Sequence, residues 1–163
     1  MTAKVDHVLH YPGATIREVH EMLADPAFRE RVCIFQGDLR HLVRIERDHD
    51  QMVVEVDRVQ SAKGVPSFAK SFVGDEIQIV QRESWSSPAK ADVTIAIPGK
   101  PGQISGTMLL SEVRGSVEHH VRLAVKVGIP LIGGKLEGMI ADLLTYAMKA
   151  ENHAGKKWLA ESR

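Results

Sequence analysis

The stretch GIPLIGGKLEG, residues 128–138, leads directly into the longest helical pattern of the chain. Over residues 132–160 apolar side chains recur at helical spacing and form one face, made of Leu136, Ile140, Leu143, Ala147, Ala154 and Trp158. At 1.5 Å per residue, such a helix is roughly 40 Å long. We therefore predict one long C-terminal helix that lays an apolar face against the rest of the protein.

The glycine–lysine pair in this stretch raises the alternative of a phosphate-binding loop. A Walker A loop has the pattern G-x-x-x-x-G-K-[ST], but Ile129 occupies the position of its first glycine and Leu136 that of its hydroxyl residue. We therefore interpret Pro130 and the glycine pair as a hinge, although an anion at the helix N-terminus stays an open alternative. Because Gly133 and Gly134 have no side chains, we expect them to form the entrance of a cavity.

Before the hinge, the apolar period changes to two, which is typical of strands. Seven strands are predicted, at residues 4–11, two within 39–60 around a turn at 48–51, and at 77–85, 91–97, 103–113 and 116–127. Short turns separate the later strands, so successive strands are expected to pair antiparallel. Residues 64–76 are rich in turn residues and are predicted to form a connection.

Two short helices are predicted within residues 15–35. Thr15 and Glu18 have the spacing of a capping box, and Asp25 followed by Pro26 is typical of a second helix start. The order is strand, two helices, six strands and long helix. This order predicts an α+β fold in which a curved seven-stranded antiparallel sheet wraps around the C-terminal helix, as a single domain over residues 1–163.

Composition excludes several classes of function. The 163 residues contain 21 Lys plus Arg and 21 Asp plus Glu, so no overall charge attracts nucleic acid or an anionic membrane. Neither a signal peptide nor an apolar run of ~20 residues is visible, and we expect a cytoplasmic protein without integral membrane association. Motifs for nucleotides and zinc are absent, so no cofactor is expected.

No metal site is expected either. His7 and His10 have opposite parity on one predicted strand, as do His119 and His120 on another, so neither pair forms a two-ligand clamp. Cys33 is the only cysteine, and its apolar neighbours favour a buried structural role over a nucleophile.

The sheet and the long helix can enclose a space, and the chain has few aromatic residues to fill it: four Phe, two Trp and two Tyr. We expect a ligand cavity of roughly 300–1,000 Å³. Its predicted lining is Val93, Ile95, Met108, Leu110, Val121 and Leu123 from the sheet, and Leu136, Ile140, Leu143 and Ala147 from the helix.

Three polar residues interrupt the inward-facing rows. Gln81 and Glu83 lie in the row that contains Trp85, and His119 shares a face with Val121. We expect Gln81, Glu83 and His119 to orient a ligand. The alternatives are that Glu83 pairs with an arginine at the rim, and that His119 is a buried histidine hydrogen-bonded to a neighbour.

Three segments resemble a known superfamily: PSFAKSFVGDEIQIVQRESW (66–85), IPGKPGQISGTMLL (97–110) and VGIPLIGGKLEGMIADLLTYAMKAENHAGKKWL (127–159). They are similar to an actinobacterial branch, of unknown function, of the START / SRPBCC superfamily, which includes Bet v 1-like allergens and aromatic polyketide cyclases. The resemblance implies a helix-grip fold that holds an apolar ligand between helix and sheet. A minority of superfamily members use this pocket for cyclisation, hydration or dehydration.

The leading functional hypothesis is therefore binding or transport of a lipid-like or polycyclic molecule. The first alternative is a cyclase or dehydratase in which His119 and Glu83 transfer protons. For a binding protein, no catalytic residue is expected. The second alternative is a protein-interaction module with an incidental cavity.

Overall fold

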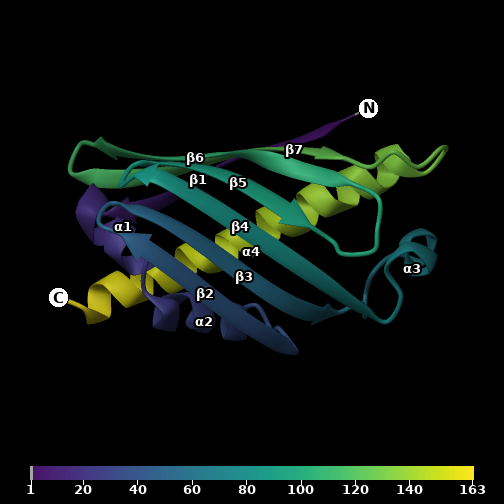
Figure 1. The fold of residues 1–163 in the computed structure, drawn as a ribbon, viewed down its shortest axis with the longest axis horizontal. Helices are drawn as coiled ribbons and strands as arrows, with labels where there is room; N and C mark the ends of the chain where they lie inside the picture. The colour runs from purple at the N-terminus through teal and green to yellow at the C-terminus, as the bar shows by residue number, and fades with distance from the viewer. Residues whose placement is uncertain (1) are drawn as a thin grey trace.

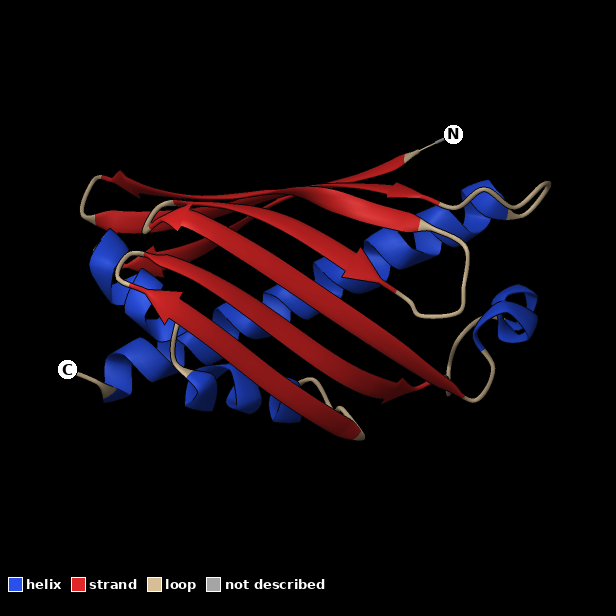
Figure 2. Cartoon of the chain, viewed as in Figure 1, coloured by secondary structure: helices blue, strands red, loops and turns tan. Residues whose placement is uncertain are grey.

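A computed structural model describes residues 2–163 (Figures 1 and 2). The elements in chain order are β1 (Ala3–Pro12), α1 (Ile16–Leu23), α2 (Pro26–Phe35), β2 (Arg40–Asp48), β3 (Gln51–Ser61), α3 (Ser67–Val73), β4 (Glu76–Ser87), β5 (Lys90–Ala96), β6 (Gln103–Val113), β7 (Ser116–Lys126) and α4 (Gly133–Glu161). This order confirms the predicted α+β fold.

The seven strands form one antiparallel sheet in the order β1-β7-β6-β5-β4-β3-β2. Strands β2 to β7 form a meander, and β1 pairs with β7 along its whole length, from Ala3 opposite Val125 to Pro12 opposite Ser116. The sheet curves around α4, which crosses its inner face diagonally in Figure 1. Apolar residues of the inner strand faces and of α4 therefore form the core.

Helix α4 is 29 residues long and is covered by the sheet on one side only. Its inward residues include Leu136, Ile140 and Ala154, whereas Lys149 and Lys156 are exposed. Within residues 2–163, no helix is both long and apolar enough to cross a membrane.

The hinge before α4 is held by contacts that explain its sequence. The carboxylate of Glu137, which is buried, accepts a hydrogen bond from the backbone N–H of Val127 at 2.7 Å. A Cβ atom at Gly133 would lie only 2.6 Å from the carbonyl oxygen of Val127, so a side chain there would clash with the backbone. The glycine and the glutamate thus fix the angle at which the helix leaves the last strand.

Helices α1 and α2 fill one end of the space under the sheet. Both begin as predicted: Thr15 and Glu18 form the capping box of α1, and Asp25 caps α2 by accepting from the N–H of Ala27 at 2.9 Å. Phe28 of α2 packs edge-on against Trp158 of α4, with ring centroids 5.5 Å apart. The core at this end of the molecule is consequently closely packed.

The opposite end of the sheet carries α3, within the segment predicted to be only a connection (Figure 1). That prediction was incomplete, because the segment contains a short helix whose residues Ala69, Phe72 and Val73 are buried. Seven residues are too few to show a helical period clearly among turn residues. The helix brings Phe72 and Val73 to the edge of the cavity described next.

Candidate ligand-binding cavity

Two adjacent spaces lie between α4 and the inner face of the sheet. An inner cavity has a volume of about 70 Å³, and an outer cavity has a volume of about 490 Å³. They share six lining residues: Gln36, Arg58, Ile79, Ile95, Leu144 and Ala147. The outer volume lies within the range of roughly 300–1,000 Å³ typical of small-molecule sites.

The outer cavity is mainly apolar. Phe72 of α3, Ile77 of β4, Ile97 beyond β5 and Met139 of α4 contribute to its walls. Tyr146, which also lines it, is 75% exposed, so this cavity reaches the solvent between α3 and the middle of α4. An apolar molecule can therefore reach its walls from the surface.

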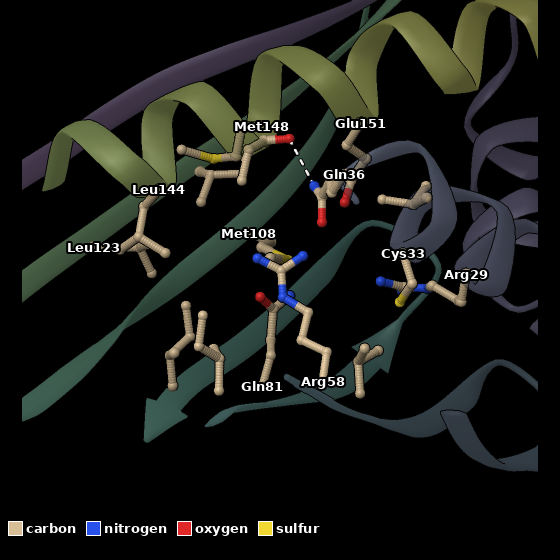
Figure 3. A pocket seen from close by; sticks show the side chains of 16 residues that line it. Arg29, Cys33, Gln36, Arg58, Gln81, Met108, Leu123, Leu144, Met148 and Glu151 are labelled. Atoms are coloured by element: carbon tan, nitrogen blue, oxygen red, sulfur yellow. Dashed lines mark hydrogen bonds between the residues drawn. The ribbon is translucent and has the colours of Figure 1, made fainter. Parts of the chain in front are cut away.

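The inner cavity is polar at its deep end. Figure 3 shows Arg58 and Gln81 extending from the sheet toward Gln36, which follows α2, and Glu151 of α4. Arg29 of α2 also lines this cavity. These charged and amide side chains form two groups with different hydrogen bonding.

The first group, here called the closed cluster, consists of Arg29, Glu83, Gln81 and Trp85. Arg29 donates two hydrogen bonds to the carboxylate of Glu83, both at 2.8 Å, and a third to the carbonyl oxygen of Leu23 at 2.7 Å. Glu83 also accepts from Nε2 of Gln81 at 2.7 Å and from Nε1 of Trp85 at 2.9 Å. Burial raises the pKa of Glu83, but the charge and hydrogen bonds of Arg29, together with the hydrogen bonds from Trp85 and Gln81, lower the pKa overall.

The second group, here called the open cluster, consists of Arg58, Gln36 and Glu151. The Arg58 guanidinium makes no hydrogen bond to any described residue, and the carboxylate nearest to it is that of Asp38, whose Oδ2 lies 4.0 Å from Nη1. Gln36 donates to the carbonyl oxygen of Ala147 at 2.9 Å, while its buried Oε1 has no partner among residues 2–163. The donors of Arg58 and the acceptor of Gln36 are thus free for a ligand.

Glu151 has an unusual acidity for a glutamate. Burial raises its pKa to about 7, and the opposing charge of Arg29 does not offset this effect. Cys33, which also lines the inner cavity, has its pKa raised to about 12 by burial, so its thiol stays protonated. Glu151 is therefore the group of this cavity that exchanges a proton near neutral pH.

The cavity linings include some of the residues predicted from the sequence and leave out others. The inner cavity is bordered by Gln81, Ile95, Met108, Val121, Leu123 and Ala147. Ile95 and Ala147 also border the outer cavity, as do Ile140 and Leu143. Among the described residues, the predicted ones that are buried outside both linings are Glu83, Val93, Leu110, His119 and Leu136.

Four of the five buried residues outside the linings share a position along the strands, and the fifth, Leu136, lies in α4. Glu83 is paired with Val93, and Leu110 with His119, near the strand ends that α1 and α2 cover. Alternation along a strand predicts which face a side chain is on, but it does not predict how far along the strand the helices fill the space.

Glu83 and His119 do not face a common cavity. Glu83 is paired with an arginine, as one alternative predicted, but the partner is the buried Arg29 rather than a residue at the rim. His119 is buried as expected, yet neither of its ring nitrogens has a hydrogen-bond partner among residues 2–163. Burial lowers the pKa of His119 to about 4, so the ring is neutral at physiological pH.

The proposed entrance at the hinge is displaced from the cavity. Gly133 is buried against Val127, and within the described chain neither Gly133 nor Gly134 lines the inner or the outer cavity. The opening lies further along α4, where Leu143 and Tyr146 are exposed. The glycines serve the hinge geometry instead.

The three residues of the open cluster are among the polar lining residues that the sequence analysis missed. Arg58 follows Val54 and Val56 with the same parity on β3, so it continues an inward-facing row. Glu151 lies four residues after Ala147, on the apolar face of α4. Both positions were detectable as polar residues on an apolar face, the signal that had selected Gln81. Gln36 follows the last residue of α2 and had no such signal.

No metal centre is apparent in the described part of the chain. Residues 2–163 contain no group of three or more His, Cys, Asp or Glu side chains arranged to hold an ion. The polar end of the cavity offers hydrogen-bond donors and acceptors, which suits recognition of an organic group.

Comparisons with known proteins agree with this architecture. A family model described as "Protein of unknown function (DUF2505)" matches residues 6–159. An uncharacterized protein of Mycobacterium tuberculosis is 24% identical over 174 residues, which cover 99% of this chain and 99% of that protein.

Solved structures are similar in fold. The protein TTHA0849 from Thermus thermophilus has a TM-score of 0.68 at 15% identity, over 99% of this chain and 100% of the other. The di-domain ARO/CYC StfQ from the steffimycin biosynthetic pathway has a TM-score of 0.69 at 11% identity, over 99% of this chain and 52% of StfQ. At these identities the similarity concerns the fold alone: it bears out the helix-grip fold that the resemblance implied.

Proposed function

Since the chain belongs to the DUF2505 family, whose function is unknown, we propose its function from the cavity: it binds an elongated, apolar small molecule that has one polar end. The observation that carries this proposal is the adjacency of the two spaces. An apolar cavity of about 490 Å³, reaching the solvent, adjoins an inner cavity of about 70 Å³ that is polar at its deep end.

The distribution of polar groups supports an oriented ligand. In the outer cavity, Phe72, Ile77 and Met139 offer only apolar surface to the body of a ligand. At the inner end, Arg58 and Gln36 have unused hydrogen-bonding groups. Binding sites for small molecules commonly combine a large apolar lining with a few polar groups that fix orientation.

A competition experiment tests this function. The protein is delipidated and titrated with the neutral fluorescent probe Nile red, and a panel of apolar compounds is then used to displace the probe. Ala147→Trp places an indole between the two cavities, because Ala147 lines both. We expect this variant to bind the probe at least tenfold more weakly (about 1.4 kcal/mol).

Lys149→Trp is the matched control. It introduces the same side chain on the same helix, at an exposed position. We expect it to bind Nile red as the unmodified protein does. If the unmodified protein binds neither the probe nor any compound of the panel, or if both variants lose binding equally, the cavity is not a ligand site.

Acid–base catalysis is a second candidate, favoured by one observation. Glu151, with its pKa raised to about 7, lines the inner cavity, as a general acid or base of a cyclase or dehydratase would. The test is proton exchange in heavy water at the carbons beside the carbonyl of a bound ketone, followed by NMR. Exchange that is faster with the protein than with its Glu151→Gln variant supports catalysis, and equal rates exclude it for such ketones.

A further inference from the structure

We propose that the inner end of the cavity recognises an uncharged oxygen group of the ligand, a hydroxyl or a carbonyl, and that Arg58 and Glu151 are the residues that hold it. The inference rests on the proposed binding function and specifies the chemical class of ligand. It follows from three properties of the open cluster: free donors, the balance of charge and the position of Glu151.

Arg58 supplies the free donors. Its side chain is only 13% exposed, and it lines both cavities. A guanidinium group has five N–H donors and no acceptor, so it needs oxygen atoms around it when it is buried. Its nearest carboxylate oxygen, Oδ2 of Asp38, is 4.0 Å away, which is beyond hydrogen-bonding distance. A ligand oxygen between the two cavities would accept from these donors.

The charges around the cavity favour a neutral ligand group. Arg29 and Glu83 neutralise one another in the closed cluster, and Asp38 lies opposite Arg58. A carboxylate on the ligand would add a negative charge near Asp38 and Glu83, and an ammonium group would face both arginines. Unpaired charge is costly in a buried site, whereas a hydroxyl or carbonyl leaves the balance unchanged.

Glu151 completes the site. Its titratable neighbours are Arg29 and Cys33 from α2, Arg58 from β3, Glu83 from β4 and Tyr11 from β1. Burial raises the pKa of Glu151 most; the charges of Arg29 and Arg58 lower it and that of Glu83 raises it. When an apolar ligand replaces solvent in the cavity, Glu151 is desolvated further and its protonated form is favoured. The protonated carboxyl then donates a hydrogen bond to the ligand oxygen, and Oε1 of Gln36 can accept one from a ligand hydroxyl.

This arrangement links ligand binding to proton uptake. The pKa of Glu151 is about 7 in the free protein and is raised further in the complex, so the complex holds the proton more tightly. Affinity is therefore highest below the pKa of the free protein and falls as the pH rises through it. Removing the titratable group should remove this dependence.

The test uses compounds with one apolar chain and different ends: decane, decanol, methyl octyl ketone, decanoate and decylamine. Each displaces Nile red from the delipidated protein. We expect decanol and the ketone to bind roughly tenfold more tightly than decane, decanoate and decylamine at about pH 7. Tightest binding of decanoate or decylamine would overturn the inference, as would equal binding of all five.

Two variants refine the test. Arg58→Met replaces the guanidinium side chain by a shorter, unbranched apolar one and so removes its donors, and we expect it to bind decanol about as weakly as decane. Glu151→Gln cannot titrate, and we expect its affinity for decanol to be constant, whereas that of the unmodified protein falls several-fold between about pH 6 and about pH 9. Equal pH dependence of the two proteins would contradict the role of Glu151. If no compound binds, including decane, the proposed binding function itself fails.

Discussion

The closed and the open cluster are built from similar residues but have opposite environments. In the closed cluster, the Arg29 guanidinium and the Glu83 carboxylate are almost fully buried and bond to each other at two points. In the open cluster, Arg58 and Glu151 line a cavity and make no such pair. The comparison indicates that a buried, multiply hydrogen-bonded ion pair holds the fold, while polar groups beside a cavity that have unused hydrogen-bonding capacity are available for a ligand.

The largest expected effect is on the closed cluster. Glu83→Gln removes the charge opposite Arg29 and leaves a buried guanidinium without its counter-ion. We expect it to lower the free energy of unfolding by about 3–5 kcal/mol, measured by urea denaturation near neutral pH. Arg58→Met is the comparison in the open cluster; because Arg58 lies 4.0 Å from Asp38 and donates no hydrogen bond to it, we expect a smaller loss, of about 1–2 kcal/mol. Equal losses for the two variants would show that the clusters do not differ in this way.

Two glycines of α4 test the same contrast between a filled and an open end. A Cβ atom at Gly155 would lie 2.6 Å from Cε1 of Tyr11, whereas at Gly138 it would meet no atom within 4 Å. We expect Gly155→Ala to destabilise the protein by about 1–3 kcal/mol through overpacking.

Gly138→Ala is the comparison substitution. We expect it to raise stability by about 0.5–1 kcal/mol, because alanine is the better helix former. Thermal denaturation measures both changes. A stabilising Gly155→Ala would mean that the end of the core near Tyr11 is not closely packed.

A third prediction concerns the pH dependence of stability. The pKa of Glu151 is raised in the folded protein. The contribution of Glu151 to the free energy of unfolding is therefore fully present below the unfolded pKa of this residue, and it is lost as the pH rises through the folded pKa of about 7. We expect Glu151→Gln to be more stable than the unmodified protein by about 1–2 kcal/mol at about pH 8 and equally stable at about pH 4. Urea denaturation of both proteins at the two pH values checks this. A Glu151→Gln variant that is less stable than the unmodified protein at the higher pH would contradict it.

The smallest effect is expected at His119, beside the closed cluster. Burial lowers the pKa of His119 to about 4 in the folded protein. Its contribution to the free energy of unfolding is therefore present above its unfolded pKa and is lost as the pH falls through the folded pKa of about 4. His119→Leu should therefore reduce the loss of stability between about pH 7 and about pH 5 by about 1 kcal/mol. An unchanged acid profile would show that this histidine does not contribute to acid sensitivity.

Much of the fold follows from periodicity. The apolar face of α4, the alternation in the strands and the caps at Thr15 and Asp25 are local patterns, and the structure contains all of them. Short turns between strands indicate antiparallel neighbours, which is why the meander was predictable, whereas the pairing of β1 with β7 was not predicted. The helix α3 was missed because it is short and lies among turn residues.

The site was less predictable, because it depends on where the interior is filled. Glu83 and Gln81 alternate on one face of β4, but only Gln81 reaches the cavity. The partner of Glu83 is Arg29, which is 54 residues away in sequence, and no local pattern links the two. Depth along a strand depends on helices contributed by other segments, and a single sequence does not give their placement.

The most direct test of the difference between the clusters is a carbon NMR titration of the Glu151 carboxyl, assigned by comparison with Glu151→Gln, in the free protein and in its complex with decanol. We expect a midpoint near 7 in the free protein and a clearly higher midpoint in the complex. A midpoint in the ordinary range of glutamate, unchanged by decanol, would contradict the assignment of this end of the cavity to a ligand.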